Sequence, residues 1–264
     1  NNEKLIVTLG CLYSEMANVT KAIELFNEAL KLNPKSTEAM LNMGATLKDI
    51  GEIDNAIKYY INAIKIDENC FNAYGNLGCS YTSIGDYEKA IEYFKSGIQI
   101  APNDPSLFAN MGQTYHQMNK IAEAHRCFFR SLDIDPNFLI AHINQGVLYL
   151  KLGNYDNAII SFEHALRIDE KSIEANLNYA ALLGDIGKYN EAESYIEKVL
   201  KIDPKINTAI SNLLLMSNYS SENCKKYISE LHKKNGNLIE SNFQLLNPHK
   251  FSYFEDEVKE KINI

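Results

Sequence analysis

A period of 34 residues runs through most of this chain and constrains its fold more than any other feature. A glycine recurs at this spacing, and an alanine takes the same position once, in the sixth unit. This glycine slot holds Gly10, Gly44, Gly78, Gly112, Gly146 and then Ala180. Self-similarity at a period of roughly 20–50 residues indicates an array whose units bury their apolar faces only by stacking on one another. We therefore expect six similar stacked units.

Each unit contains two stretches with the helical spacing of apolar residues, separated by a short break. Glycine reaches a positive φ without steric cost, so it can end one helix and free the chain for the next. The breaks fall at Ala17, Gly51, Gly85, Asn119, Gly153 and Gly187. An alanine slot holds Ala22, Ala56, Ala90, Ala124, Ala158 and Ala192. A bulky slot, which we expect to fill the space between units, holds Phe26, Tyr60, Phe94, Phe128, Phe162 and Ile196.

This pattern resembles the tetratricopeptide repeat, a 34-residue unit with small residues at two slots, an aromatic four residues later and a proline near its end. Proline stands at that end in four units, at Pro34, Pro102, Pro136 and Pro204. We place the repeats at 3–36, 37–70, 71–104, 105–138, 139–172 and 173–206, followed by an unpaired helix from 207. No tryptophan opens any repeat, which departs from the family pattern. The resemblance implies an all-α, right-handed solenoid of helical hairpins, with the first helix of each pair lining its concave face.

One further series on the same period is not required by the fold. Two residues before the glycine slot the chain carries asparagine six times in succession, and only the first unit departs, with Thr8. The series is Asn42, Asn76, Asn110, Asn144, Asn178 and Asn212. Asparagine is a mediocre helix former because its side chain competes for backbone hydrogen bonds, so a packing slot would not favour it. In the tetratricopeptide repeat this slot projects into the concave groove.

We interpret these six residues, called the asparagine row below, as a peptide-binding site. Each side-chain amide offers an acceptor and two donors, which suit the N–H and the C=O of one peptide unit. Helices pack about 8–10 Å apart and an extended chain rises about 3.3 Å per residue, so successive asparagines would meet every third residue. The row would then hold roughly 15 residues, with weak sequence preference. The alternative is that these amides bond to neighbouring helices and stiffen the solenoid.

A continuous asparagine row resembles the repeat domain of the family that contains protein O-GlcNAc transferase and SPINDLY, a protein O-fucosyltransferase. The end of the sequence adds to this resemblance. After a short polar gap, a helical stretch begins at Ser221 and ends with His232 and two lysines before Gly236. The segment that joins repeats and catalytic domain in this family has the same order, although it usually carries an aromatic residue where this chain has Asn235. Residues 262–264 resemble the start of the first catalytic-domain strand.

We therefore divide the chain into three parts. Residues 3–219 form six repeats plus an unpaired helix, 220–236 a capping or linker helix, and 237–264 a linker into a catalytic domain that continues beyond Ile264. The sequence begins with asparagine rather than methionine, so we expect it to be a piece of a longer protein. Solenoids need a polar terminal cap, and the alternative for the tail is therefore a solubilising helix with a disordered end.

The resemblance implies the substrate-polypeptide-binding domain of a protein O-glycosyltransferase of the cytoplasm or nucleus. The parent enzyme would transfer O-GlcNAc or O-fucose to Ser or Thr, from UDP-GlcNAc or GDP-fucose as donor. The present chain would itself hold neither catalytic residues nor a cofactor. Its partners would be extended or disordered segments of substrate proteins, and the repeats could form a homodimer.

The alternative is a free-standing scaffold for protein–protein interaction without enzymatic activity. One subclass, the carboxylate clamp for acidic chaperone tails, needs basic residues in the groove. The groove slots hold Val7, Leu41, Gly75 and Ala109, then Lys4, Glu38, Asn72 and Ser106, so only one of them is basic. A carboxylate clamp is therefore not expected. The sequence leaves open a bacterial-type assembly or secretion scaffold.

Composition argues against several other classes. Lys and Arg number 26 against 34 Asp and Glu, a net charge of −8, whereas nucleic-acid binding needs clustered cations. No apolar run approaches the roughly 18–20 residues of a membrane span. The five cysteines are odd in number and lack C-x-x-C spacing, so we expect buried free thiols in a reducing compartment. The histidines lack metal-binding spacing, and we expect His142 to pack between helices.

Overall fold

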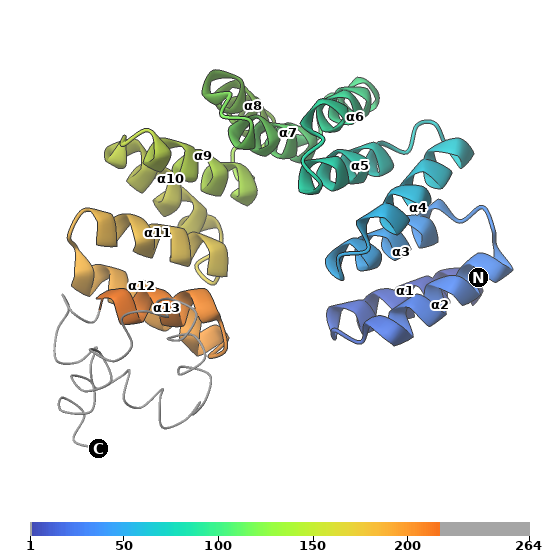
Figure 1. The fold of residues 1–264 in the computed structure, drawn as a ribbon, viewed down its shortest axis with the longest axis horizontal. Helices are drawn as coiled ribbons and strands as arrows, with labels where there is room; N and C mark the ends of the chain where they lie inside the picture. Colours follow the sequence, from blue (N-terminus) through green and yellow to red (C-terminus); the bar gives the residue numbers. More distant parts are fainter. Residues whose placement is uncertain (1, 217–264) are drawn as a thin grey trace, which may run out of the picture. The chain divides into compact units, whose positions relative to one another are not determined.

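The computed structural model describes residues 2–216, which form thirteen helices and no strand (Figure 1). The predicted helix at 220–236 and the predicted strand at 262–264 lie outside the described residues. The helices are α1 (Asn2–Glu15), α2 (Val19–Leu32), α3 (Thr37–Asp49), α4 (Ile53–Ile66), α5 (Phe71–Ser83), α6 (Tyr87–Ile100), α7 (Pro105–Gln117), α8 (Ile121–Ile134), α9 (Leu139–Lys151), α10 (Tyr155–Ile168), α11 (Ile173–Asp185), α12 (Tyr189–Ile202) and α13 (Asn207–Met216). The predicted all-α fold of helical hairpins is confirmed. We number the hairpins 1 to 6, from α1–α2 to α11–α12.

The chain divides into two compact units, residues 1–144 and 145–264. In the first unit, α1 pairs with α2, α3 with α4, α5 with α6 and α7 with α8. The first helices also contact one another in order, α1 with α3, α3 with α5 and α5 with α7, whereas each second helix packs mainly against first helices. The first unit therefore has an inner row of first helices and an outer row of second helices. In the second unit α11 pairs with α12, which also packs on α13.

Glycine at the glycine slot leaves space for the bulky side chain of the same hairpin. A Cβ atom on Gly78 would lie 2.6 Å from Cε1 of Phe94, and one on Gly44 would lie 2.5 Å from Cε1 of Tyr60. Such distances are too short for two carbon atoms, so only glycine fits beneath the ring. The sequence predicted that this side chain fills space between units. The structure also places it against the glycine of its own hairpin.

The six predicted breaks between paired helices all adopt the left-handed backbone conformation. Their φ angles lie between +56° at Ala17 and +84° at Gly51. Four are glycines, which reach this region without steric cost, and the other two are Ala17 and Asn119. The prediction that these positions turn one helix into the next is therefore confirmed.

The connections between hairpins share a second recurring turn that the sequence analysis did not use. An Asn or Asp follows five of the second helices, and its side-chain oxygen accepts a hydrogen bond from the backbone N–H two residues later. Asp67 accepts from Asn69 at 3.0 Å and Asp169 from Lys171 at 2.9 Å. The same bond recurs at Asn33, Asp135 and Asp203. Proline follows three of these five residues, at Pro34, Pro136 and Pro204, where its fixed φ suits the turn.

Candidate binding surfaces

The asparagine row lies on the first helices, as the repeat register requires. Asn42, Asn76, Asn110 and Asn144 belong to the first unit, on α3, α5, α7 and α9. Asn178 and Asn212 belong to the second unit, on α11 and α13. All six are partly buried, between the exposed surface and the core. In the first unit, Asn42, Asn76 and Asn110 lie on three helices of the inner row, α3, α5 and α7.

The face that each asparagine occupies follows from helix geometry. On α3, Ala39, Met43 and Leu47 form the buried stripe that packs into the core. Successive residues of an α-helix are about 100° apart, so Asn42 is turned well away from Met43. The same register places Asn76 before the buried Leu77 and Asn110 before the buried Met111.

None of the six row amides makes a side-chain hydrogen bond within the described part of the chain. Asn176, two residues before Asn178 on the same helix, shows what an engaged amide looks like. It is fully buried, and its Nδ2 donates to the carbonyl of Glu170 at 2.9 Å and to that of Ser172 at 2.7 Å. The alternative that the row stiffens the solenoid therefore has no hydrogen bond in its favour among these residues.

Hydroxyl groups, not amides, join the neighbouring first helices of the first unit. Ser14 Oγ on α1 lies 3.2 Å from Thr46 Oγ1 on α3. Thr82 Oγ1 on α5 lies 2.8 Å from Thr114 Oγ1 on α7. These bonds link α1 to α3 and α5 to α7 without the use of the asparagine side chains.

The other candidate residues have structural surroundings. His142 is 8% exposed, and its Nε2 bonds to the carbonyl of Pro136 at 2.9 Å, which confirms the predicted packing role. Among residues 2–216, no group of three or more His, Cys, Asp or Glu side chains could hold a metal ion. In the same range no helix combines the length and apolar character needed to cross a bilayer.

The described cysteines are free thiols, but only one of the four is buried. Cys127 belongs to the core, whereas Cys11, Cys70 and Cys79 are half-buried, and Cys224 lies outside the described residues. Burial raises the pKa of each of the four thiols, and it raises that of Cys127 to about 11. They are therefore protonated and weakly nucleophilic near neutral pH.

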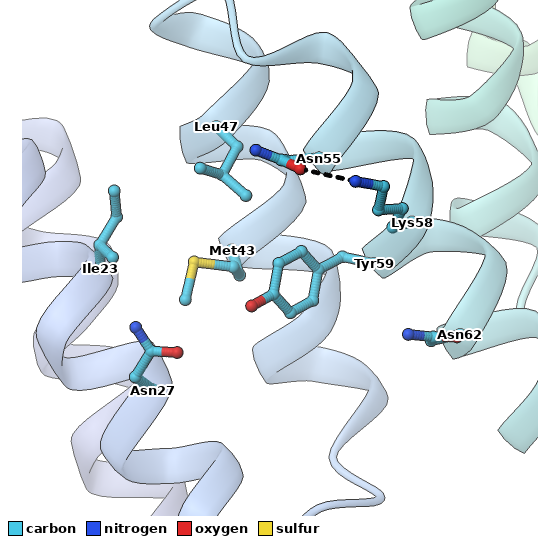
Figure 2. A pocket seen from close by; sticks show the side chains of 8 residues that line it. All are labelled: Ile23, Asn27, Met43, Leu47, Asn55, Lys58, Tyr59 and Asn62. Carbon is cyan, nitrogen blue, oxygen red and sulfur yellow. Dashed lines mark hydrogen bonds between the residues drawn. The ribbon is translucent and has the colours of Figure 1, made fainter.

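The outer side of the first unit carries a hollow that the sequence analysis missed. It lies between α2 and α4 above α3 and has a volume of about 410 Å³ (Figure 2). Its lining is Ile23, Asn27, Met43, Leu47, Asn55, Lys58, Tyr59 and Asn62. The available signal was Leu47, which stands where the units at Tyr13, Tyr81, Tyr115 and Tyr149 carry tyrosine.

Comparison with known proteins identifies tetratricopeptide repeats along most of the described chain. Models of the tetratricopeptide repeat match residues 4–36, 37–70, 71–104, 105–138 and 138–205. No curated protein matches the sequence.

Among solved structures, a thermophilic repeat protein of Thermus thermophilus is 21% identical with a TM-score of 0.64, covering 69% of this chain and 98% of that chain. A chain of the Cut9–Hcn1 hetero-tetramer of APC/C is 20% identical with a TM-score of 0.69, covering 81% of this chain and 43% of that chain. PilF of Pseudomonas aeruginosa is 21% identical with a TM-score of 0.61, covering 78% of this chain and 94% of that chain. At these identities the likeness shows the fold alone.

Proposed function

The chain belongs to the tetratricopeptide repeat family, a scaffold for protein–protein interaction, and we propose that it holds an extended segment of a partner protein along the asparagine row. One observation carries this proposal. The six row amides are partly buried on the first helices, yet they make no hydrogen bond within the described part of the chain. Because asparagine weakens a helix and these amides join no helices, a bound polypeptide supplies the missing reason for the series.

The proposed contact is between side-chain amide and peptide backbone. Each asparagine would accept from one peptide N–H and donate to one C=O, as strands do in a sheet. A hydrogen bond of this kind contributes about 0.5–1.5 kcal/mol, so affinity grows with the number of amides engaged. The recognition would be broad, because the backbone is the same in every sequence.

A double substitution in the first unit tests the row. Asn110→Ala combined with Asn144→Ala removes two adjacent amides, and we expect the affinity for a fluorescent, unstructured 15-residue peptide to fall roughly tenfold or more. Fluorescence anisotropy measures the affinity, and circular dichroism measures the helicity, which should not fall because alanine is the better helix former.

Two controls make this test specific. Asn157→Ala combined with Asn190→Ala removes two exposed amides from the second helices α10 and α12 and should leave affinity unchanged. The same peptide with N-methylated peptide bonds loses its backbone donors and should bind poorly to every variant. Equal binding of the methylated peptide, or a melted domain with unchanged affinity per folded molecule, would show that the row is structural.

The finer proposal is that the bound polypeptide is the substrate of a protein O-glycosyltransferase, with UDP-GlcNAc or GDP-fucose as donor. Its support is the resemblance of the row and of the tail, whose residues 217–264 lie outside the described part of the chain. The residues encoded after Ile264 test it. A continuation into an alternating strand–helix pattern supports the transferase, and a stop codon or a second repeat array contradicts it. This proposal includes a cytoplasmic or nuclear location of the protein and a homodimer formed through the repeats.

The alternative is a free-standing scaffold for protein–protein interaction, and one chain of similar fold belongs to the Cut9–Hcn1 hetero-tetramer. Such a scaffold recognises the side chains of one partner. Its binding would therefore be lost on scrambling the peptide sequence, whereas binding by the asparagine row would survive scrambling and be lost on N-methylation.

A further inference from the structure

Three second helices carry a tyrosine at the same slot, and two of these rings have an aromatic neighbour from their own hairpin. The ring of Tyr93 on α6 stacks on that of Tyr81, with centroids 5.3 Å apart and planes within 5°. The ring of Tyr195 on α12 meets that of Tyr179 edge-on, with centroids 4.9 Å apart. The third tyrosine, Tyr59 on α4, forms no stacked or edge-on ring pair within the described part of the chain, although it packs against the core clusters that contain Phe26, Tyr60 and Met40.

The reason lies in two substitutions on α3. Leu47 occupies the slot that holds Tyr81 in hairpin 3, and Met43 occupies the slot that holds Tyr179 in hairpin 6. Neither side chain offers a ring. Hairpin 2 therefore presents the same tyrosine as hairpins 3 and 6 but lacks the ring that covers it in either of them.

The outer hollow is found where the ring is missing. Figure 2 shows the ring of Tyr59 projecting from α4 beside Met43, with Ile23 and Asn27 facing it from α2. The floor is apolar and firmly packed, since Met43 is 1% exposed and Leu47 is 7% exposed. The volume of about 410 Å³ lies within the range of roughly 300–1,000 Å³ that is usual for ligand sites.

The positive charge of Lys58 at the rim indicates what kind of partner would fit the hollow. Lys58 is the charged residue of the lining, and its Nζ donates to Asn55 Oδ1 at 3.0 Å. It forms no ion pair with a carboxylate among the described residues. The same slot holds Glu92 in hairpin 3 and Arg126 in hairpin 4, so hairpin 2 differs from hairpin 3 in the sign of this charge. A carboxylate on the incoming segment would be complementary to this ammonium group.

We propose that the outer hollow receives an aromatic side chain from a partner protein, carried by a segment with an acidic residue beside the aromatic one. The incoming ring packs on Tyr59 as Tyr81 packs on Tyr93, and the carboxylate meets Lys58. Aromatic pairs prefer offset-stacked or edge-on arrangements, which are the two that this chain already uses at the same slot. The site lies on the outer row of helices and does not depend on the asparagine row.

Three capped dipeptides probe the site on the full chain. The probes are N-acetyl-Asp-Tyr-amide, N-acetyl-Asp-Leu-amide and N-acetyl-Lys-Tyr-amide, and the signal is the ¹³C-methyl resonance of Met43, assigned with Met43→Leu. We expect saturable shifts with the Asp-Tyr probe. The Asp-Leu probe should bind roughly tenfold more weakly because it has no ring. The Lys-Tyr probe should bind roughly two- to fivefold more weakly because its charge opposes Lys58.

Two variants distinguish binding at this site from non-specific binding. Leu47→Tyr supplies the missing ring from within, and it should abolish saturable binding of the Asp-Tyr probe while the chain remains folded. Tyr59→Leu removes the receiving ring and should weaken binding roughly tenfold. Tyr93→Leu is the matched control, since it removes the corresponding ring of hairpin 3, and it should leave the Met43 shifts unchanged.

The outcomes are decisive in both directions. Ring-dependent, charge-dependent binding that Leu47→Tyr abolishes supports the proposal. Equal shifts from the Asp-Tyr and Asp-Leu probes, no saturable shift, or unchanged binding to a folded Leu47→Tyr variant would overturn it. If Leu47→Tyr does not fold, Tyr59→Leu compared with Tyr93→Leu decides the question by the same measurement.

Discussion

Hairpins 3 and 6 follow the same 34-residue template but fill the same space in opposite ways. In hairpin 3, Gly78 leaves room for the ring of Phe94, whose Cε1 lies where a Cβ would have to be. In hairpin 6 the small residue is Ala180 and the facing side chain is Ile196, and both are fully buried. The larger residue on one helix is thus matched by the smaller residue on the other, and what the repeat keeps constant is the volume of the pair.

This comparison explains why the chain tolerates glycine at the glycine slot of five helices. Glycine in a helix interior costs about 1 kcal/mol relative to alanine, because it loses more freedom on folding. Burying a large apolar side chain contributes about 1.5–3 kcal/mol, and the ring can be buried here only above a glycine. In hairpin 6, Ile196 replaces the ring, so glycine is no longer needed and the glycine slot holds Ala180.

Placing the small residue of hairpin 6 in hairpin 3 should give the largest effect. Gly78→Ala puts a methyl group 2.6 Å from Phe94 Cε1, and Phe94 is fully buried and cannot withdraw to solvent. Overpacking costs about 1–3 kcal/mol, and the better helix propensity of alanine offsets part of it. We expect a net loss of up to about 2 kcal/mol in the free energy of unfolding, measured with urea.

A rescue by the partner substitution sharpens the same comparison. Phe94→Ile on its own should destabilise by leaving a space, but the double variant reproduces the Ala180–Ile196 pair of hairpin 6. We expect a coupling free energy of roughly 1–2 kcal/mol between the two substitutions. Strict additivity of the two single effects would show that the pair is not the unit of packing.

The second prediction concerns the one hydroxyl among the bulky side chains. Tyr60 is fully buried, and its hydroxyl has no hydrogen-bond partner in the described part of the chain, whereas four other units carry phenylalanine. A buried polar group without a partner costs about 1–3 kcal/mol. Tyr60→Phe should therefore raise the free energy of unfolding by about 1 kcal/mol at neutral pH.

The pH dependence of this gain has a definite sign. Burial raises the pKa of Tyr60 far above the ordinary value of 10.0, so the folded chain holds the phenol neutral. Above about pH 10 the unfolded chain loses this proton first, and the stability of the natural chain falls through that range. The advantage of Tyr60→Phe should widen above pH 10 in parallel urea titrations. A constant difference across that range would mean that Tyr60 titrates normally in the folded state.

Most of the fold could be predicted because the spacing of residues within one stretch of sequence determines which face of a helix each residue occupies. The breaks at Ala17 and Gly51 and the series at Asn42 follow from spacing within single hairpins. Local periodicity fixes which face a residue occupies, and so it placed the asparagine row on the first helices.

The outer hollow could not be predicted in the same way. It depends on Leu47 on one helix, Tyr59 on the next and Asn27 on the preceding hairpin, which come together only after packing. Leu47 departs from the tyrosine of four other units, but this departure alone does not predict a hollow. The combination of these three residues becomes informative only beside the Tyr81–Tyr93 stack, where the same two slots meet as rings.

The smallest predicted effect concerns the break between paired helices, which hairpins 1 and 2 fill differently. Ala17 has a φ of +56° and Gly51 a φ of +84°, and the same backbone hydrogen bonds close both turns: Ala17 N–H donates to Ser14 and Gly51 N–H to Lys48, each at 2.9 Å. A Cβ on Gly51 would meet nothing within 4 Å, so a substitution there changes the backbone conformation alone. Gly51→Ala should cost about 1 kcal/mol, and Ala17→Gly should gain about 0.5 kcal/mol, because glycine relieves the left-handed strain but gains freedom in the unfolded chain. Thermal unfolding of both variants measures the pair, and a loss of stability in Ala17→Gly would mean that the chain carries no strain at that turn.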